Sequence, residues 1–536
     1  PEFLVNKLYY DAYKKDMTAG TYPDVRSGLQ KLLKDGLLLF NYTGHGGTTA
    51  LSDEKVLTQT DINQFTYTHL PVWVTATCDF TRFDDLNTSA GEDVFLNKSS
   101  GGIALFTTVR VAYSRPNFPI NDNVIRNLFE RNNGRRRTLG EVMQATKNTL
   151  SSVYKLGFCL IGDPAVKMAY PEFGMKVTTV NGQSVDGNSI SFKALEKITV
   201  EGEVLDASGQ LVTDFTGIVN PTVKDSKVTV TCLKNSNKDD SPAFTFTDYP
   251  NTIFIGNDSV RNGKFSFTFT VPKDISYSNL QGKMNLYAVD TESGNEAQGN
   301  FDNFIVGGTS DTAETDTIGP EIRALYLNDT TFVDGGQVNT TPYFVAELWD
   351  KSGVNITGSS VGHDMMLVID ESTVLSYNLN SYYELLPGED GTGIVKFPIP
   401  ALEPGKHTAE FWVWDILNNS TVRTFTFEVV EGLKPFLFDV IATPGIAREQ
   451  VTFHLMHNRP ESRMRVGIMV YDLAGRQLWK HEESGTSGLF ENYTVSWDLT
   501  SGGARMRPGV YIYRAAISTD NSKDATKARK FIILGE

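Results

Sequence analysis

Residues 36–47 read GLLLFNYTGHGG, and residues 71–78 read PVWVTATC. Each is a short apolar run between turn-forming residues, which is the pattern of a buried β-strand. The first run leads to His45, which stands between glycines, and the second ends in Cys78. In an open parallel sheet, ligands bind outside the carboxyl ends of the strands. If the two strands are neighbours, we expect the His45 and Cys78 side chains to meet at one edge of the sheet.

A thiol beside an imidazole can ionise near neutral pH and attack a carbonyl carbon. The pair therefore predicts a cysteine hydrolase or acyltransferase. The ordinary alternative is burial, because cysteine is among the residue types most often found in cores. The glycines around His45 favour catalysis, since they let a substrate backbone approach closely. Cys159 and Cys232 lie in apolar or alternating segments, where core positions are expected.

Size and composition limit the class of protein. A chain of 536 residues, 40% hydrophobic and 21% charged, predicts several soluble globular domains. No stretch approaches the roughly 18 apolar residues that span a bilayer. The net charge of −15 argues against nucleic acid as a partner. The three cysteines have no metal-like spacing, so neither a metal nor a cofactor is expected. The opening PEFLVNKLYY lacks the pattern of a signal peptide and looks like the interior of a domain, which predicts a fragment or a processed chain.

The pattern of elements changes after residue 172. Before it, strand signals alternate with helical stretches at residues 22–34, 90–96, 121–131 and 139–150, which predicts a parallel sheet with flanking helices. After it, short alternating strands predict immunoglobulin-like β-sandwiches at 173–308, 309–432 and 433–536. Asp350 and Asp415 each follow a Trp, at two similar positions where a strand is expected to lead into a turn. Neither shows the clustered oxygen ligands that calcium requires, so no calcium site is expected.

Three motifs together resemble the gingipain-type cysteine peptidases, which have a caspase-like fold. These are YTGHGG at 42–47, ATC at 76–78, and GDP at 162–164, with His45 and Cys78 33 residues apart. The resemblance covers the first third of the chain and the later part of that family's catalytic domain. It implies that Cys78 is the nucleophile and His45 the general base and acid. The N–H groups of Gly46 and Cys78 would then form the oxyanion hole. The acidic residue that orients the histidine in this family would precede Pro1, so no residue is assigned to it.

The last segment carries a second resemblance. VGIMVYDLAGR at 466–476, WDLT at 497–500 and MRPGVYIY at 506–513 are similar to the C-terminal sandwich of proteins handled by the type IX secretion system. With the peptidase segment, this order of domains resembles the gingipain-like surface sortases of that system. It implies removal of C-terminal sorting domains from secreted cargo and transfer of the acyl group to an amine of anionic lipopolysaccharide. The site of action would be the bacterial cell surface, with outer-membrane components of the system as partners.

Two alternatives stay open. The first is an ordinary cysteine endopeptidase, in which water resolves the acyl-enzyme. The second is a surface adhesin or structural protein with an incomplete catalytic domain, because sandwiches occupy more of the chain than the peptidase segment does.

Overall fold

The computed structural model describes residues 3–65, 67, 69–98, 100–132, 135–151, 153–235, 241–311, 316–358, 362–386, 391–519 and 522–534. These residues form two compact units. Residues 3–172 and 228–248 make up an α/β unit, and residues 173–227 and 249–536 make up a β-rich unit. No helix in the described ranges is long and apolar enough to cross a membrane.

The α/β unit is built on a four-stranded sheet, whose strands in spatial order are β1 (Leu39–Thr43), β5 (Val72–Ala76), β6 (Ala104–Thr108) and β9 (Phe158–Ile161). β1, β5 and β6 are parallel, whereas β9 runs antiparallel to β6. The prediction of a purely parallel sheet is therefore wrong for its last strand. A parallel neighbour needs one helix between two strands, but two helices lie between β6 and β9. The chain therefore enters β9 at the end of the sheet where β6 finishes, and β9 runs in the opposite direction. The Val109 N–H donates to the Gly157 carbonyl there (2.8 Å).

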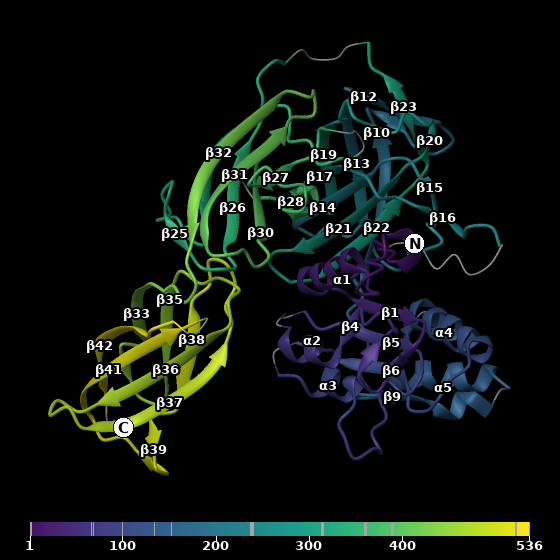
Figure 1. Ribbon diagram of the computed structural model, residues 1–536. Helices are drawn as coiled ribbons and strands as arrows, with labels where there is room; N and C mark the ends of the chain where they lie inside the picture. Colours follow the sequence, from purple (N-terminus) through teal and green to yellow (C-terminus); the bar gives the residue numbers. More distant parts are fainter. Residues whose placement is uncertain are drawn as a thin grey trace. The chain divides into compact units, whose positions relative to one another are not determined.

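Helices cover both faces of this sheet (Figure 1). Trp73 and Leu105 pack on one face with α1 (Pro23–Asp35) and α3 (Ala90–Leu96), beside α2 (Gln59–Gln64). Val74 and Phe106 pack on the other face with α4 (Ser114–Phe129) and α5 (Leu139–Thr149). Every residue of β5 and β6 is consequently buried. This explains why the two segments read as continuous apolar runs instead of alternating ones.

Short strands and 3-10 turns complete the α/β unit. They are η1 (Tyr10–Ala12), β2 (Gly46–Gly47), β3 (Ala50–Leu51), β4 (Leu57–Thr58), β7 (Arg131–Asn132), β8 (Arg135–Arg136) and η2 (Val153–Gly157). A hairpin of β15 (Val228–Thr231) and β16 (Thr245–Asp248) also packs here. The Asp11 carboxylate accepts the N–H groups of Lys234 and Asn235, and the Tyr9 ring meets Phe246 at 4.6 Å. Part of the segment predicted as the first sandwich thus belongs to the α/β unit.

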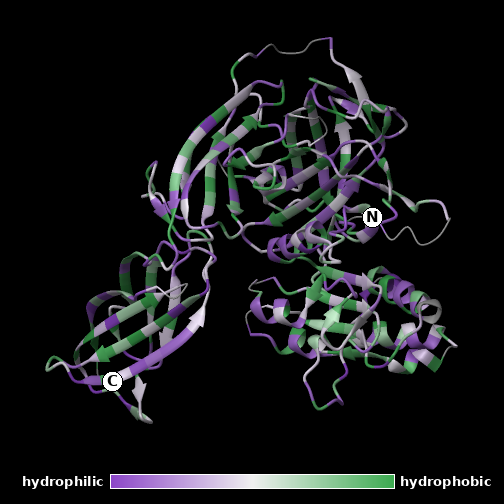
Figure 2. Cartoon of the chain, in the orientation of Figure 1, coloured by the Kyte–Doolittle hydropathy of each residue, from purple (hydrophilic) through white to green (hydrophobic). Residues whose placement is uncertain are grey.

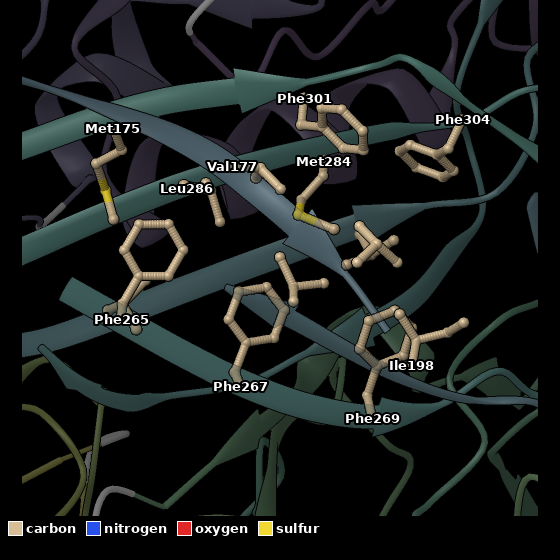
Figure 3. Close-up of a cluster of buried hydrophobic side chains, with 14 of the residues drawn as sticks. Met175, Val177, Ile198, Phe265, Phe267, Phe269, Met284, Leu286, Phe301 and Phe304 are labelled. Carbon is tan, nitrogen blue, oxygen red and sulfur yellow. The ribbon is translucent and has the colours of Figure 1, made fainter. Parts of the chain in front are cut away.

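Among the described residues, the β-rich unit contains three large apolar cores, each enclosed by sheets, and a smaller cluster of Tyr326, Tyr343, Val345 and Ile394. The first is enclosed by β10 (Phe173–Val180), β11 (Gln183–Ser184), β12 (Ile190–Ala194), β13 (Lys197–Leu205), β14 (Gly217–Lys224), β17 (Thr252–Ile255), β18 (Asp258–Arg261), β19 (Lys264–Thr270), β20 (Leu280–Gln281), β21 (Lys283–Asp290), β22 (Glu296–Phe301) and β23 (Phe304–Thr309). Phe265, Phe267 and Phe269 of β19 point into this core, as Figure 3 shows, while the residues between them are exposed or nearly so. This period of two is the pattern expected of a strand with one buried face.

The other two cores follow in chain order. The second is enclosed by β24 (Glu321–Leu327), β25 (Gln337–Val338), β26 (Tyr343–Trp349), β27 (Met366–Ile369), β28 (Ser376–Asn378), η3 (Asn380–Tyr382), β29 (Tyr383–Leu385), β30 (Thr392–Pro398), β31 (Gly405–Trp414) and β32 (Ser420–Val429). The third is enclosed by β33 (Leu437–Thr443), β34 (Ile446–Ala447), β35 (Val451–His457), β36 (Met464–Tyr471), β37 (Gln477–Gly485), β38 (Tyr493–Trp497), β39 (Thr500–Ser501), β40 (Ala504–Arg505), β41 (Gly509–Ser518) and β42 (Ala525–Ile533). Hydrophobic and hydrophilic residues alternate along many of these strands (Figure 2).

Candidate active site

Two neighbouring strands bring the predicted residues to one edge of the sheet. β1 and β5 are parallel and pair in register up to Thr43 and Ala76. His45 and Cys78 each follow two residues beyond this last pair. The two strands are therefore neighbours, which is the condition under which the two side chains were expected to meet. Both residues leave the sheet at the carboxyl ends of the strands, where open α/β sheets bind ligands.

The two loops touch through the residues next to His45 and Cys78. A β-carbon on Gly46 would lie 2.4 Å from Oγ1 and 3.1 Å from Cγ2 of Thr77, well inside normal contact distance. Glycine at position 46 therefore lets the histidine loop lie directly against the end of the cysteine strand. Thr77 is 1% exposed and its hydroxyl has no hydrogen-bond partner among the residues that the structure describes, so the side chain acts there as a packing surface.

Two hydrogen bonds fix the main chain at His45. The Tyr42 hydroxyl donates to the His45 carbonyl oxygen (2.6 Å), and the Ser52 N–H donates to the same oxygen (2.8 Å). Burial raises the pKa of the Tyr42 phenol, so this hydroxyl stays protonated as a donor. The His45 side chain is exposed, and within the described ranges no hydrogen bond or ion pair involves its imidazole. The backbone of the loop is thus held while the imidazole stays accessible.

Two backbone N–H groups at this edge are available as donors. Gly46 pairs with Leu51 in the β2–β3 hairpin, and alternate pairs of an antiparallel ladder exchange hydrogen bonds. Since His45 and Ser52 form a bonded pair, the N–H of Gly46 points away from β3. The N–H of Cys78 donates in no hydrogen bond among the described residues. Either group can therefore donate to a ligand oxygen.

Cys78 is partly buried, and its sulfur contacts the loop that follows β6. The thiol donates to the Ala112 carbonyl oxygen (3.1 Å), and the Ala112 N–H points back at the sulfur (3.4 Å). The next residue, Asp79, has a φ of 47°, and its N–H donates to the Arg110 carbonyl (3.3 Å). Such left-handed backbone costs a non-glycine residue about 1 kcal/mol or more. The chain therefore turns sharply after the thiol and leaves Cys78 at the tip of the turn.

A pocket opens beside Ala112, between the loop after β6, α4 and η2. Its wall includes Thr108, Ala112, Asn117, Ile120 and Tyr154. Because Ala112 also contacts the Cys78 sulfur, the pocket lies next to the predicted nucleophile.

The other cysteines differ in their surroundings. Cys232 is buried, and burial raises the pKa of its thiol. Cys159 lies on β9 opposite Thr107 and is only partly buried. The sequence interpretation did not identify Tyr42 or Asn117 as site residues. Tyr42 could have been found from its place in the histidine motif, whereas nothing in the sequence marks Asn117.

Three carboxylates converge in the β-rich unit. Asp316, Asp350 and Asp415 each place a carboxylate oxygen within 4.8 Å of the others. The sequence interpretation placed Asp350 and Asp415 in two separate turns that follow strands, and it therefore missed their convergence. The two carboxylates come together only when β26 and β31 fold together. Burial raises the pKa of Asp350 to about 6 and also raises the pKa of Asp415. Each of these two also accepts N–H groups of its own turn, and we assign the cluster no ligand.

Comparison with known proteins gives a family match over the α/β part. Residues 1–169 match peptidase family C25. None of the curated proteins matches the sequence. Among solved structures, dimeric latent PorU from Porphyromonas gingivalis is 38% identical over 77% of this chain, with a TM-score of 0.34. This chain spans 39% of the length of that PorU chain. The Arg-specific cysteine proteinase gingipain R is 18% identical, and the match covers 52% of this chain and 56% of that one, with a TM-score of 0.26.

Proposed function

Because this chain belongs over residues 1–169 to peptidase family C25, a family of cysteine peptidases, we propose that it acts as a cell-surface sortase. Its substrates would be secreted cargo proteins, from which it removes C-terminal sorting domains. It would then transfer the acyl group to an amine of anionic lipopolysaccharide. The contact between Gly46 and Thr77 carries the proposal, because it brings the His45 and Cys78 loops to one edge of the sheet.

The chemistry begins with His45 taking the proton of the Cys78 thiol. The thiolate attacks the carbonyl carbon of the scissile peptide bond, and the carbonyl π-electrons move onto oxygen. The N–H groups of Cys78 and Gly46 donate to this oxyanion. The tetrahedral intermediate collapses, the C–N bond breaks, and the imidazolium protonates the leaving amine. A thioester on Cys78 and a released sorting domain result.

The second half of the reaction, in which the thioester is resolved, distinguishes a sortase from a hydrolase. An acceptor amine attacks the thioester carbonyl, gives a proton to His45, and displaces the Cys78 thiolate to form a new amide. Water in the same place would give a carboxylate, which is the outcome expected of an ordinary cysteine endopeptidase. The similarity of residues 433–536 to type IX sorting sandwiches supports a place beside the outer-membrane components of that system. The extent of the β-rich unit keeps an adhesin role as the second candidate.

The test is product analysis on a cargo protein that ends in a sorting domain. The chain is incubated with this cargo and a primary amine, and intact-protein mass spectrometry follows the new C-terminus. We expect an amide-linked product that disappears in Cys78→Ala and in His45→Ala, whereas Cys159→Ala retains it. A carboxylate product alone, in the presence of saturating amine, would favour the endopeptidase. Intact cargo with the unaltered chain would refute both enzymatic proposals and favour the adhesin.

A further inference from the structure

The phenol of Tyr10 lies beside the two groups that hold the His45 main chain. The His45 carbonyl oxygen accepts the Tyr42 hydroxyl (2.6 Å) and the Ser52 N–H (2.8 Å). Burial raises the pKa of Tyr10, and polar contacts of its hydroxyl with the side chains of Ser52 and Tyr42 partly offset this effect. The centroids of the Tyr10 and Tyr42 rings are 6.5 Å apart. Tyr10 therefore contacts both residues that fix the backbone of the histidine loop.

Tyr10 belongs to the short turn η1, and a hairpin from a distant part of the chain holds this turn. The hairpin is the segment 228–248, in which β15 pairs with β16. The N–H groups of Lys234 and Asn235 donate to the two carboxylate oxygens of Asp11 (2.9 and 2.8 Å). Hydrogen bonds to an ionised carboxylate are stronger than those between neutral groups. The residue next to Tyr10 is therefore attached firmly to the hairpin.

The Asn235 side chain extends this attachment along the chain. Its Nδ2 donates to Asp11 Oδ1 (3.0 Å) and to the Tyr13 carbonyl oxygen (2.9 Å). Its Oδ1 accepts the Lys15 N–H (3.2 Å). One amide side chain thus bonds to three residues that follow Tyr10, and it uses both its donor nitrogen and its acceptor oxygen to do so.

Aromatic contacts hold the other side of the turn. The Tyr9 ring meets the Phe246 ring at 4.6 Å and the Phe244 ring at 6.0 Å between centroids, both edge to face. Such pairs stabilise a contact beyond the apolar area that they bury. The hairpin therefore fixes the chain immediately before Tyr10 as well as after it, and the position of the Tyr10 phenol depends on the hairpin.

We propose that Asn235 and Asp11 are positioning residues for His45 and that they act through Tyr10. The proposal rests on the function proposed above, in which His45 takes the proton of the Cys78 thiol. The hairpin fixes η1, and η1 fixes the phenol that contacts the groups holding the His45 carbonyl. The imidazole is exposed and has no hydrogen bond or ion pair in the described part of the chain, so its position depends on this backbone. The segments before and after the hairpin belong to the β-rich unit, so a hairpin inserted in that part of the sequence takes part in catalysis.

The test separates the position of the histidine from the stability of the fold. Labelling of Cys78 by a peptidyl acyloxymethyl ketone is measured over a range of probe concentrations, which gives the maximal labelling rate and the half-saturating concentration. We expect Asp11→Ala, Asn235→Ala and Tyr10→Phe each to lower the maximal rate about tenfold, with the half-saturating concentration unchanged within about twofold, because misplacing a reacting group slows the chemical step. A hairpin that only stabilised the fold would lower the urea midpoint and leave the maximal rate of the folded chain unchanged.

A double variant tests the route through Tyr10. Asn235→Ala/Tyr10→Phe should label about as fast as the slower of its two single variants, because residues that act through one network are not additive. Thr229→Ala is the matched control. Thr229 is exposed on the same hairpin, and no hydrogen bond among the described residues involves its hydroxyl, so this variant should keep the maximal rate.

Four results would overturn the positioning role. The first is an unchanged maximal rate in any of the three single variants that folds, and Tyr10→Phe decides alone if Asn235→Ala does not fold. The second is a double variant whose loss equals the product of the two single losses. The third is an equal loss in Thr229→Ala. The fourth is absence of Cys78 labelling in the unaltered chain, which would also refute the proposed function, whereas the first three leave that function standing.

Discussion

Gly46→Ala should separate the two loops that meet at the candidate site. The new β-carbon would lie 2.4 Å from Thr77 Oγ1, whereas ordinary contacts begin at 3.4 Å, so the loops must move apart by about 1 Å. Rotation of Thr77 gives no relief, because its Cγ2 lies at 3.1 Å and the Ala50 carbonyl oxygen at 3.3 Å. A displacement of this size costs about 100-fold in rate when it separates reacting groups. The overpacking itself costs about 1–3 kcal/mol of stability.

The assay is the rate at which a peptidyl acyloxymethyl ketone, a thiol-directed probe, labels Cys78, with stability followed by urea unfolding. Gly47→Ala is the matched control, because a β-carbon at position 47 meets no atom within 4 Å, and its rate should stay near that of the unaltered chain. Thr77→Ala removes the obstructing atoms, and in the described part of the chain the Thr77 hydroxyl has no hydrogen bond to lose. The double variant Gly46→Ala/Thr77→Ala should therefore recover most of the rate. Equal rates for Gly46→Ala and Gly47→Ala, or no recovery in the double variant, would refute the reasoning.

Three further predictions each concern a single residue. Tyr42→Phe removes the hydrogen bond to the His45 carbonyl and should lower the free energy of unfolding in urea by about 1 kcal/mol. An unchanged unfolding midpoint would contradict the role assigned to this hydroxyl. The folded-state pKa of Asp350, about 6, exceeds the ordinary 3.8, so the folded chain binds this proton first and its stability should rise as pH falls from 7.5 to 5, by about 1.4 kcal/mol. Asp350→Asn should raise Tm by a clearly larger amount at pH 7.5 than at pH 5. Calorimetry that finds equal effects at the two pH values would exclude this titration. Gly162→Ala should lower the free energy of unfolding by about 2–4 kcal/mol, because φ is 132° and the new β-carbon would lie 2.8 Å from that of Ala104. An unchanged stability in urea would contradict this strain.

Much of the α/β unit could be predicted from local pattern. The apolar periodicity of residues 22–34 predicted α1, and the two continuous apolar runs predicted β1 and β5 as buried strands of a parallel sheet. The direction of β9 could not be predicted, because it depends on how many helices cross between two strands, and not on the composition of β9 itself. The association of residues 228–248 with the α/β unit was missed for a similar reason, since it depends on long-range bonds such as those to Asp11.

The sequence by itself determined which residues stand at the strand ends, because strand length and the glycines after β1 are written in consecutive positions. It placed His45 and Cys78 at the candidate site and assigned the family by motif. Only the tertiary structure decided that Gly46 lies against Thr77 and that Asn117 lines the pocket beside the thiol. Those contacts join residues about 30 or more positions apart through packing, and a contact between distant segments has no local pattern by which a sequence can reveal it.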